Sequence, residues 1–365
     1  MTPQRVLVAG ASGVVGFAAA KHFSQRADWS VVGVSRRAPR RLPGVELVSV
    51  DLADRAQCES VFAQMRDVTH VVYAALFEKP GLIPGWLERD QMQRNLEMLR
   101  NLLDPLTAAA RDLRHVAVLQ GTKAYGCHVG SMAIPGRERA PRHRHENFYW
   151  LQEDYLRDKQ SGQGWHWTIL RPQIVFGEAF GSNMNPIPAL GVYAALQRYA
   201  GLPLDFPGGA AIVGEAVDAD LLARALHWAA TTPEQGNQIF NVTNGDALTM
   251  RGLWPALADA TGMEVGGDKP MALAAEMPKR QSSWEEIVRR FGLVSPARLD
   301  DFVGQSFIYA DLICGFGVQQ SLPPMLVSTI KIRQAGFHDC VDSEDMLRRW
   351  IAHFQREQLL PPREW

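Results

Sequence analysis

Short apolar runs alternate with amphipathic stretches along the first half of the chain. Runs rich in Val, Ile and Leu predict buried strands over residues 6–9, 30–34, 45–50, 69–75, 113–119 and 167–170. Apolar residues at helical spacing predict intervening helices over residues 14–26, 55–65, 88–111 and 149–159. Strands that alternate with helices favour a doubly wound parallel sheet, so we expect an α/β fold.

A glycine-rich turn joins the first expected strand to the first expected helix. Residues Gly10–Gly16 read G-x-x-G-x-x-G, and such glycines let a pyrophosphate approach the backbone while the helix N-terminus offers free N–H groups. The motif alone would also fit a tight turn without a ligand, but the flanking strand and helix favour a Rossmann dinucleotide-binding turn. The cofactor-binding residues expected here are Gly10, Ser12, Gly13, Val14, Val15 and Gly16.

The residues after the second expected strand indicate which dinucleotide binds. Enzymes that use NAD place an acidic residue there, which binds the ribose 2′-OH. This chain instead has Ser35, Arg36 and Arg37. Two guanidinium groups suit a 2′-phosphate, so Arg36 and Arg37 favour NADP(H); the alternative is a solvated basic loop.

The ends of the third and fourth strands are expected to add cofactor contacts. Asp51 and Leu52 follow the third strand and are expected beside the adenine, although Asp51 would also suit the cap of the next helix. Ala74 and Ala75 end the fourth strand and are expected to line the same crevice, because ligands bind at the carboxyl ends of such strands.

The alternation of strands and helices loosens after Gly177. The remaining pattern predicts helices over residues 186–199, 250–261 and 342–357 and a strand over 238–242. A further helix is expected to begin at the capping-box sequence Ser283–Glu286 and to end at Gly292. We therefore expect an NADP-binding Rossmann domain over 1–177, to which the later strand returns, and a smaller, helix-rich, mainly substrate-binding lobe over 178–365.

Two tyrosines compete for a catalytic role. Short-chain dehydrogenases pair a tyrosine with a lysine one helical turn later, and Tyr155 and Lys159 have this spacing. Tyr155, however, lies inside its helix and too close to Arg171-Pro172, which marks the end of the next strand. Tyr149 opens the helix and fits better, although the residue four positions later is Glu153 rather than lysine.

We therefore expect the lysine that supports Tyr149 to come from another segment of the chain. Lys123 follows the fifth strand, where the superfamily normally presents a serine or threonine, and from there its ammonium is expected to reach the hydroxyl of Tyr149. Alternatively, Lys123 is an ordinary loop lysine, and Tyr149 is an aromatic residue that packs beside Phe148 and Trp150. Lys123 and Tyr149 are the predicted catalytic residues.

These features together resemble the progesterone 5β-reductase and iridoid synthase-like group of atypical extended short-chain dehydrogenases. The resemblance covers nearly the whole chain and is carried by residues 10–16, 35–37, 119–126, 147–154, 171–177, 182–185, 192–195, 240–246 and 284–288. Its most specific part is Asn147-Phe148-Tyr149-Trp150 combined with a lysine after the fifth strand. Two differences are a shorter Gln120-Gly121 segment and a shorter loop between Lys123 and Tyr149.

The resemblance implies reduction of an activated C=C bond by NADPH, as in a 3-oxo-Δ4-steroid 5β-reductase. Tyr149 would hydrogen-bond the enolate oxygen and Lys123 would support it. The implied contacts near the nicotinamide are Gln120, Tyr149, Ile174, Ser182 and Met184. Apolar residues expected to line the substrate pocket are Phe307, Ile308 and Tyr309.

Two other functions remain open from the sequence. A carbonyl reductase or alcohol dehydrogenase would use the same tyrosine and lysine, because both reactions need a proton donor beside a carbonyl oxygen. A non-catalytic NADP(H)-sensing regulator would share the fold, but it would typically lack the tyrosine.

Composition narrows the class of partner. The net charge is −1, so no overall field favours nucleic acid or an anionic membrane, and no apolar run reaches membrane-spanning length. The four cysteines are widely spaced and, with the histidines between residues 128 and 145, fit no usual zinc pattern. We expect a cytoplasmic enzyme that acts on a small-molecule enone, without a metal; family members often form homodimers.

Overall fold

The computed structural model describes residues 4–37 and 42–365. The chain divides into two compact units, and each is built from three stretches of sequence. The first unit contains Met1–Pro172, Ala219–Val242 and Val327–His338. The second contains Gln173–Asp218, Thr243–Leu326 and Asp339–Trp365. The chain thus crosses from the first unit to the second after Pro172, and it returns with a helix and a strand and later with a short helix. The predicted division into cofactor-binding and substrate-binding parts stays a prediction.

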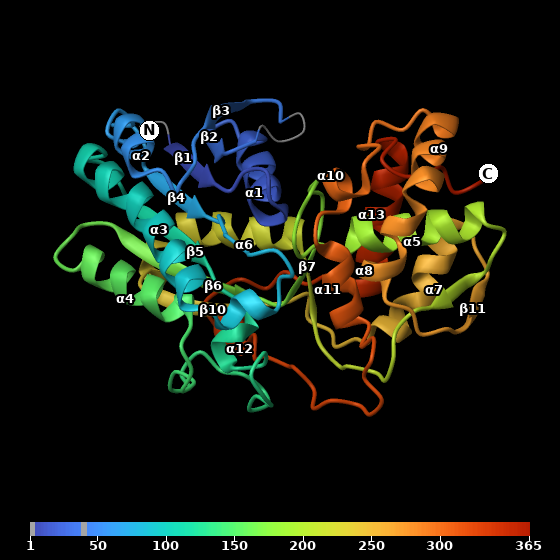
Figure 1. Ribbon diagram of the computed structural model, residues 1–365. Coiled ribbons are helices and arrows are strands. Elements are labelled where there is room, and N and C mark those ends of the chain that lie inside the picture. The colour runs from blue at the N-terminus through green and yellow to red at the C-terminus, as the bar shows by residue number, and fades with distance from the viewer. Residues whose placement is uncertain (1–3, 38–41) are drawn as a thin grey trace. The chain divides into compact units, whose positions relative to one another are not determined.

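The first unit is built on a sheet of seven parallel strands (Figure 1). Their spatial order is β10 (Gln238–Val242), β6 (His166–Pro172), β5 (His115–Leu119), β4 (His70–Tyr73), β1 (Gln4–Ala9), β2 (Trp29–Ser35) and β3 (Val45–Ser49). The chain runs outward from β1 to β3 on one side and from β4 to β10 on the other. This reversal between β1 and β4 confirms the predicted doubly wound Rossmann sheet, and ligands bind such sheets outside the carboxyl ends of the strands at the reversal.

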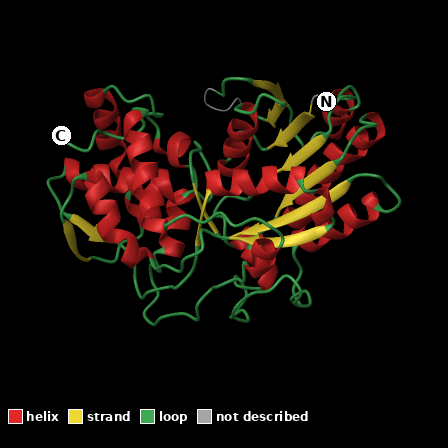
Figure 2. Cartoon of the chain, turned by 180° about the vertical axis from the view of Figure 1, so that it is seen from behind, coloured by secondary structure: helices red, strands yellow, loops and turns green. Residues whose placement is uncertain are grey.

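Helices cover both faces of this sheet (Figures 1 and 2). On one face α1 (Val14–Ser24) packs against α6 (Ala219–Thr231), and on the other α2 (Arg55–Phe62), α3 (Arg89–Ala109) and α4 (Phe148–Gln160) pack in succession. Burial on both faces explains why β1 contains the uninterrupted apolar run Val6–Ala9, whose side chains have no exposed surface. Helix α6 is absent from the sequence prediction.

The second unit is organised around α5 (Pro186–Tyr199). Residues 186–197 of this helix are all buried, and Asn185 caps it by accepting a hydrogen bond from the N–H of Ile187. It is surrounded by α7 (Met250–Thr261), α9 (Gln281–Phe291), α11 (Ser306–Ile313) and α13 (Ser343–Arg356). The strands here form two short parallel pairs, β7 (Ile174–Phe176) with β9 (Ala216–Asp218) and β8 (Leu204–Phe206) with β11 (Val265–Asp268). This confirms the helix-rich character expected for the C-terminal part.

The start of α9 was predicted wrongly. The helix begins at Gln281, two residues before the expected cap at Ser283, and no side chain caps it. The reason is that the preceding short helix α8 (Leu273–Glu276) and the turn after it lead directly into α9. Its end was predicted correctly, because Gly292 has a φ of 59°, a conformation that favours glycine.

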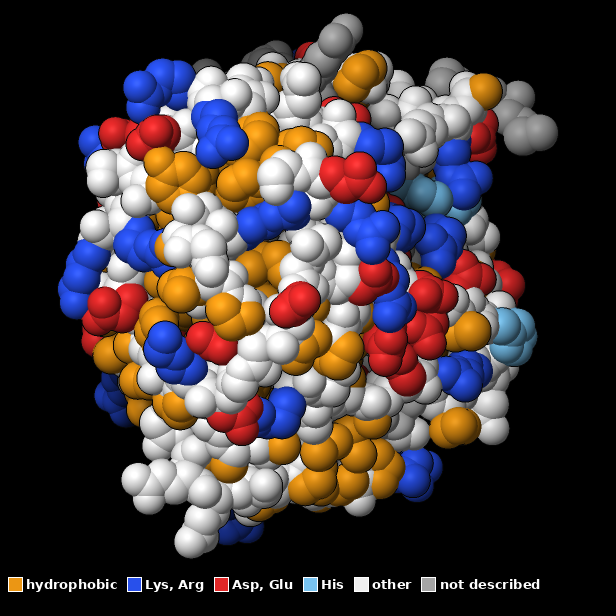
Figure 3. All heavy atoms as spheres, turned by 90° about the vertical axis from the view of Figure 1, so that its right-hand side faces the viewer, with side chains coloured by type: hydrophobic (Ala, Val, Ile, Leu, Met, Phe, Trp, Pro, Cys, Tyr) orange, Lys and Arg blue, Asp and Glu red, His pale blue; other side chains and the backbone are white. Residues whose placement is uncertain are grey.

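The surface carries charges of both signs. On the face drawn in Figure 3, Lys, Arg, Asp and Glu side chains are interspersed with hydrophobic ones, as is usual for a surface in contact with water. Among the described helices none is both long enough and apolar enough to span a bilayer.

Candidate active site

Two glycines allow the turn after β1 to pack closely. Gly10 has a φ of 83°, and a Cβ atom there would lie 2.8 Å from the carbonyl of Ala74, which follows β4. A Cβ on Gly16, in the first turn of α1, would lie 2.2 Å from the carbonyl oxygen of Gly10. Both positions therefore require glycine, and together they bring the beginning of α1 against the ends of β1 and β4.

The N-terminus of α1 is open toward a ligand. Gly13 is the N-cap residue and has no side chain to satisfy the first helical N–H groups. Ser12, Val14 and Val15 are partly exposed around it. Free N–H groups and the positive end of the helix dipole suit a pyrophosphate, so the residues present fit the predicted dinucleotide.

The two arginines after β2 are exposed. Arg36 and Arg37 lie just beyond the carboxyl end of the strand. Their backbone carbonyls accept hydrogen bonds from the hydroxyls of Ser49 and Ser35, which ties this loop to β3 and β2. The guanidinium groups are thus presented to solvent at the edge of the sheet where the glycine turn lies.

The other predicted cofactor residues of the first unit lie along the same edge. Ala74 and Ala75 are partly exposed immediately after β4. Asp51 follows β3 and is partly exposed, whereas Leu52 is buried. Asp51 does not cap α2, because that cap is Asp54, which accepts a hydrogen bond from the N–H of Gln57.

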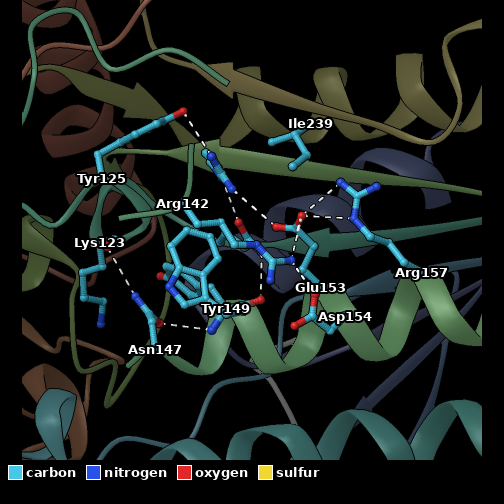
Figure 4. Close-up of polar contacts among 12 residues, drawn as sticks. Lys123, Tyr125, Arg142, Asn147, Tyr149, Glu153, Asp154, Arg157 and Ile239 are labelled. Atoms are coloured by element: carbon cyan, nitrogen blue, oxygen red, sulfur yellow. Dashed lines mark hydrogen bonds and ion pairs between the residues drawn. The ribbon is translucent and has the colours of Figure 1, made fainter. Parts of the chain in front are cut away.

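The segments that carry Tyr149 and Lys123 meet at the start of α4 (Figure 4). The side chain of Asn147 caps the helix by accepting a hydrogen bond from the N–H of Tyr149, at 3.1 Å, and it donates another to the carbonyl of Lys123, at 3.3 Å. The Tyr149 hydroxyl lies 3.2 Å from the position that a Cβ on Gly121 would occupy. The phenol of Tyr149 therefore lies over Gly121, in the turn that follows β5, and Gly121 precedes Lys123 by two residues.

The ammonium of Lys123 is enclosed by aromatic rings and a carboxylate. Its Nζ lies 4.2 Å from the ring centre of Trp86 and 5.9 Å from that of Phe148. Glu78 Oε1 lies 3.5 Å away. The Lys123 side chain is 12% exposed and that of Glu78 is fully buried. Burial lowers the pKa of Lys123, and the Glu78 carboxylate opposes that shift.

A hydrogen-bond network fixes the strand ends behind Tyr149. Gln120 donates to the carbonyl of Tyr149 and accepts a hydrogen bond from Arg171 of β6, at 2.8 Å. Arg171 also contacts the hydroxyl of Tyr125, which donates to Asn241 of β10 at 2.6 Å. Three neighbouring strands are thus tied together directly behind the first turn of α4.

A buried carboxylate completes this network. Glu153, one turn after Tyr149 in α4, lies 3.5 Å from Arg171, and both side chains are 5% exposed. The more exposed Arg142 and Arg157 contact the same carboxylate at 3.1 and 3.0 Å (Figure 4). Glu153, which occupies the position of a catalytic lysine in the usual spacing, is instead the counter-ion of the buried arginine.

The Tyr155 and Lys159 pair lies on another face of α4. The Tyr155 hydroxyl donates to Asp104 of α3 at 2.8 Å, and Lys159 binds the same carboxylate oxygen at 2.8 Å. Desolvation and that carboxylate raise the pKa of Tyr155 above its ordinary value. The pair therefore joins two helices and does not contribute to the arrangement around Lys123.

The remaining predicted site residues belong to the second unit. Ile174 and Phe307 are buried, whereas Ser182, Met184, Ile308 and Tyr309 are partly exposed. Their roles toward the nicotinamide and the substrate stay predictions.

The histidines near the site show no arrangement for a metal. His143 and His145 approach one another at 2.8 Å through their Nδ1 atoms, and the ring of His128 lies 4.9 Å from that of His145. Within residues 4–37 and 42–365 no group of His, Cys, Asp and Glu could hold a metal ion.

Glu78 and Trp86 are the site residues that sequence reasoning missed. Both lie between β4 and α3, a stretch without periodicity, and they approach Lys123 only through the fold. The available signal was a carboxylate five residues beyond β4, because the chain leaves that strand at the ligand-binding edge.

Comparisons with known proteins identify the family of the chain. A family model described as the NAD dependent epimerase/dehydratase family matches residues 6–243. The chain is 33% identical to an (S)-8-oxocitronellyl enol synthase of Antirrhinum majus, with 84% of this chain and 81% of the relative covered. It is 32% identical to a 3-oxo-Delta(4,5)-steroid 5-beta-reductase of Arabidopsis thaliana, with 97% and 92% covered.

Solved structures support the fold. The UDP-glucose 4-epimerase of Thermotoga maritima superposes with a TM-score of 0.66 at 16% identity, covering 97% of this chain and 99% of that one. The chain is an oxidoreductase of the NAD dependent epimerase/dehydratase family, and within it belongs to the progesterone 5β-reductase and iridoid synthase-like group.

Proposed function

We propose that the protein reduces the activated C=C bond of a small enone with NADPH. The observation that carries this proposal is the meeting of the Tyr149 and Lys123 segments at Asn147, beside the carboxyl ends of the central strands. The relatives named as an enol synthase and a steroid 5β-reductase support this choice over reduction of a carbonyl group.

Residues of the first unit would hold the dinucleotide. The open N-terminus of α1 would bind the pyrophosphate, and Arg36 and Arg37 would pair with the 2′-phosphate. Solved structures of the same fold contain NAD, for example the UDP-glucose 4-epimerase of Thermus thermophilus. Preference for NADP(H) rests on the two arginines and on the missing carboxylate after β2.

The chain's own residues would stabilise the charge that develops on the substrate. When bound, the reduced nicotinamide supplies a hydride to the β-carbon of the enone. The Tyr149 hydroxyl would donate a hydrogen bond to the carbonyl oxygen as negative charge gathers there, and the ammonium of Lys123 would favour that charge. The α-carbon then takes a proton from solvent.

Product analysis tests the reaction type. The enzyme is incubated with NADPH and, separately, a small enone, a steroid enone and the matched saturated ketones. We expect oxidation of NADPH only with the enones and a saturated ketone as product. Formation of an allylic alcohol, or equal activity on saturated ketones, would establish carbonyl reduction instead.

Removal of the two guanidinium groups tests the choice of cofactor. The double variant Arg36→Ala and Arg37→Ala should raise the Kd for NADPH by at least about a hundredfold, because it removes two charge-assisted hydrogen bonds that contribute about 1.5–3 kcal/mol each. Its Kd for NADH should barely change. Titration of protein fluorescence with each dinucleotide measures both constants.

The matched control is Arg66→Ala, which removes an exposed arginine before β4, at the opposite ends of the strands. It should leave both constants unchanged. Equal weakening of NADPH and NADH in the double variant would show that the arginines do not recognise the 2′-phosphate.

A further inference from the structure

A fully buried carboxylate faces the predicted catalytic lysine. Glu78 Oε1 lies 3.5 Å from Lys123 Nζ, and no surface of the Glu78 side chain is exposed. Apart from Glu78, Lys123 Nζ has no hydrogen-bond partner among the described residues. A charge that is buried without an opposite charge nearby is strongly unfavourable, so each of the two groups depends on the other.

Helix α3 holds the carboxylate in place. Gln91 donates a hydrogen bond to Glu78 Oε2 at 2.6 Å and accepts one from the N–H of Lys79 at 2.9 Å. Asn95, one turn later, exchanges two hydrogen bonds of 2.9 Å with the backbone of Phe77. The residues on both sides of Glu78 are thus pinned to α3, and the carboxylate is directed toward the lysine by buried amides.

The other groups around the Lys123 ammonium are uncharged. The faces of Trp86 and Phe148 favour a cation. Burial raises the pKa of the Cys127 thiol, so the thiol stays protonated near neutral pH. Burial, with other histidines and Lys123, lowers the pKa of His128 to about 4, so its ring is neutral there. Among the described residues, Glu78 is the one carboxylate that faces Lys123.

We propose that Glu78 is a positioning residue that keeps Lys123 in its charged form and holds the ammonium against the ring of Trp86, beside the start of α4. This inference rests on the proposed function, because the charged lysine is what supports Tyr149. It assigns a role to a fully buried residue outside the predicted catalytic pair. Glu78 acts through the lysine and sets the pH range over which the lysine stays charged.

The sign of the expected effect follows from the burial of the pair. Burial lowers the pKa of Lys123, and the neighbouring carboxylate counteracts this. Burial also raises the pKa of Glu78, which the ammonium and the Gln91 hydrogen bond oppose. If the negative charge is removed, the buried amine loses its proton at a lower pH, and activity should be lost from the alkaline side.

The substitution Glu78→Gln tests this with little change in shape. Rates of NADPH oxidation in single-turnover reactions with an enone are measured from pH 6 to pH 9. The alkaline limb of the profile should move to lower pH by at least about one unit. At a pH on that limb, the rate should therefore fall roughly tenfold. Activity on the acid side and the Kd for NADPH should stay near those of the unmodified enzyme.

Glu88→Gln is the matched control. Glu88 belongs to the same loop but pairs with the partly exposed Lys79 at the surface, so its removal should leave the pH profile in place. The variant Glu78→Asp retains the charge and should restore at least part of the alkaline activity.

A second readout does not depend on activity. The ligand-free protein is labelled with carbon-13 at the lysine ε-carbon, and the Lys123 signal is assigned by its loss in Lys123→Arg. Its titration midpoint should fall in Glu78→Gln. If that variant does not fold, Gln91→Leu serves instead. It removes the hydrogen bond that stabilises the ionised carboxylate of Glu78 and leaves every charged residue in place, so the Lys123 midpoint should move in the same direction.

The outcomes separate this inference from the proposed function. A Lys123 midpoint that is unchanged in Glu78→Gln, or in Gln91→Leu, overturns the role of Glu78. Full enone reduction by Lys123→Met would overturn the catalytic role of the lysine, even if the NMR midpoint responds to Glu78 as expected.

Discussion

Replacement of Tyr149 by phenylalanine should reduce kcat for enone reduction by roughly 10²–10⁴-fold, the usual contribution of a positioned proton donor. Only the hydroxyl is lost, so the ring should keep its buried position beside Phe148, where the two ring centres lie 4.5 Å apart. The Asn147 cap uses the backbone N–H of Tyr149 and is unaffected. The Kd for NADPH should therefore change little. Steady-state kinetics and dinucleotide titration measure the two quantities.

Tyr155→Phe provides the control on the same helix. It removes the hydrogen bond to Asp104, which lies away from Lys123, and should cost about 1 kcal/mol of stability without lowering kcat. If Tyr149→Phe keeps full activity, Tyr149 has no place in the mechanism. If Tyr155→Phe is the inactive variant, the usual Y-x-x-x-K pair is the functional one after all.

The second large effect concerns stability. Glu153→Gln removes the carboxylate that lies beside the buried guanidinium of Arg171. A buried charge that loses its partner typically destabilises a protein by about 3–5 kcal/mol. We expect a value of about 3 kcal/mol, because the glutamine oxygen keeps part of the contact and Gln120 still accepts a hydrogen bond from Arg171. Urea-induced unfolding, followed by circular dichroism, measures this loss.

The adjacent Asp154 gives the comparison. Its carboxylate binds Arg142 at the surface, where it is 62% exposed. Asp154→Asn should therefore change the free energy of unfolding by no more than about 0.5 kcal/mol. Equal effects of the two substitutions would mean that the Glu153–Arg171 pair is not what stabilises the ends of β5, β6 and β10.

Because Arg171 also binds Gln120, the Glu153 substitution has a second consequence. Gln120 donates to the carbonyl of Tyr149. A displacement of Arg171 would therefore move Gln120, which in turn contacts the first turn of α4. A moderate loss of kcat should accompany the loss of stability in Glu153→Gln and be absent in Asp154→Asn.

Local sequence determined the Rossmann sheet and its glycine turn. Strands that are buried on both faces consist of continuous apolar runs, and Gly10 and Gly16 are required by backbone contacts with residues close by in the chain or at the next strand. The end of α9 followed from a local signal as well, because Gly292 was identified as its C-terminal glycine. The true start of α9 did not follow, because the preceding short helix and turn decide it. Helix α6 was missed although Leu221, Leu222, Ala225 and Leu226 have helical spacing in the sequence.

The tertiary structure alone decided the surroundings of the predicted catalytic residues. A spacing of four residues suggested Tyr155 and Lys159, but both bind Asp104 on another helix. Glu78 approaches Lys123 across 45 residues of sequence, and no periodic pattern encodes that distance. Short-range patterns specify backbone conformation, whereas the charge state of a buried lysine depends on which distant groups the fold brings near it.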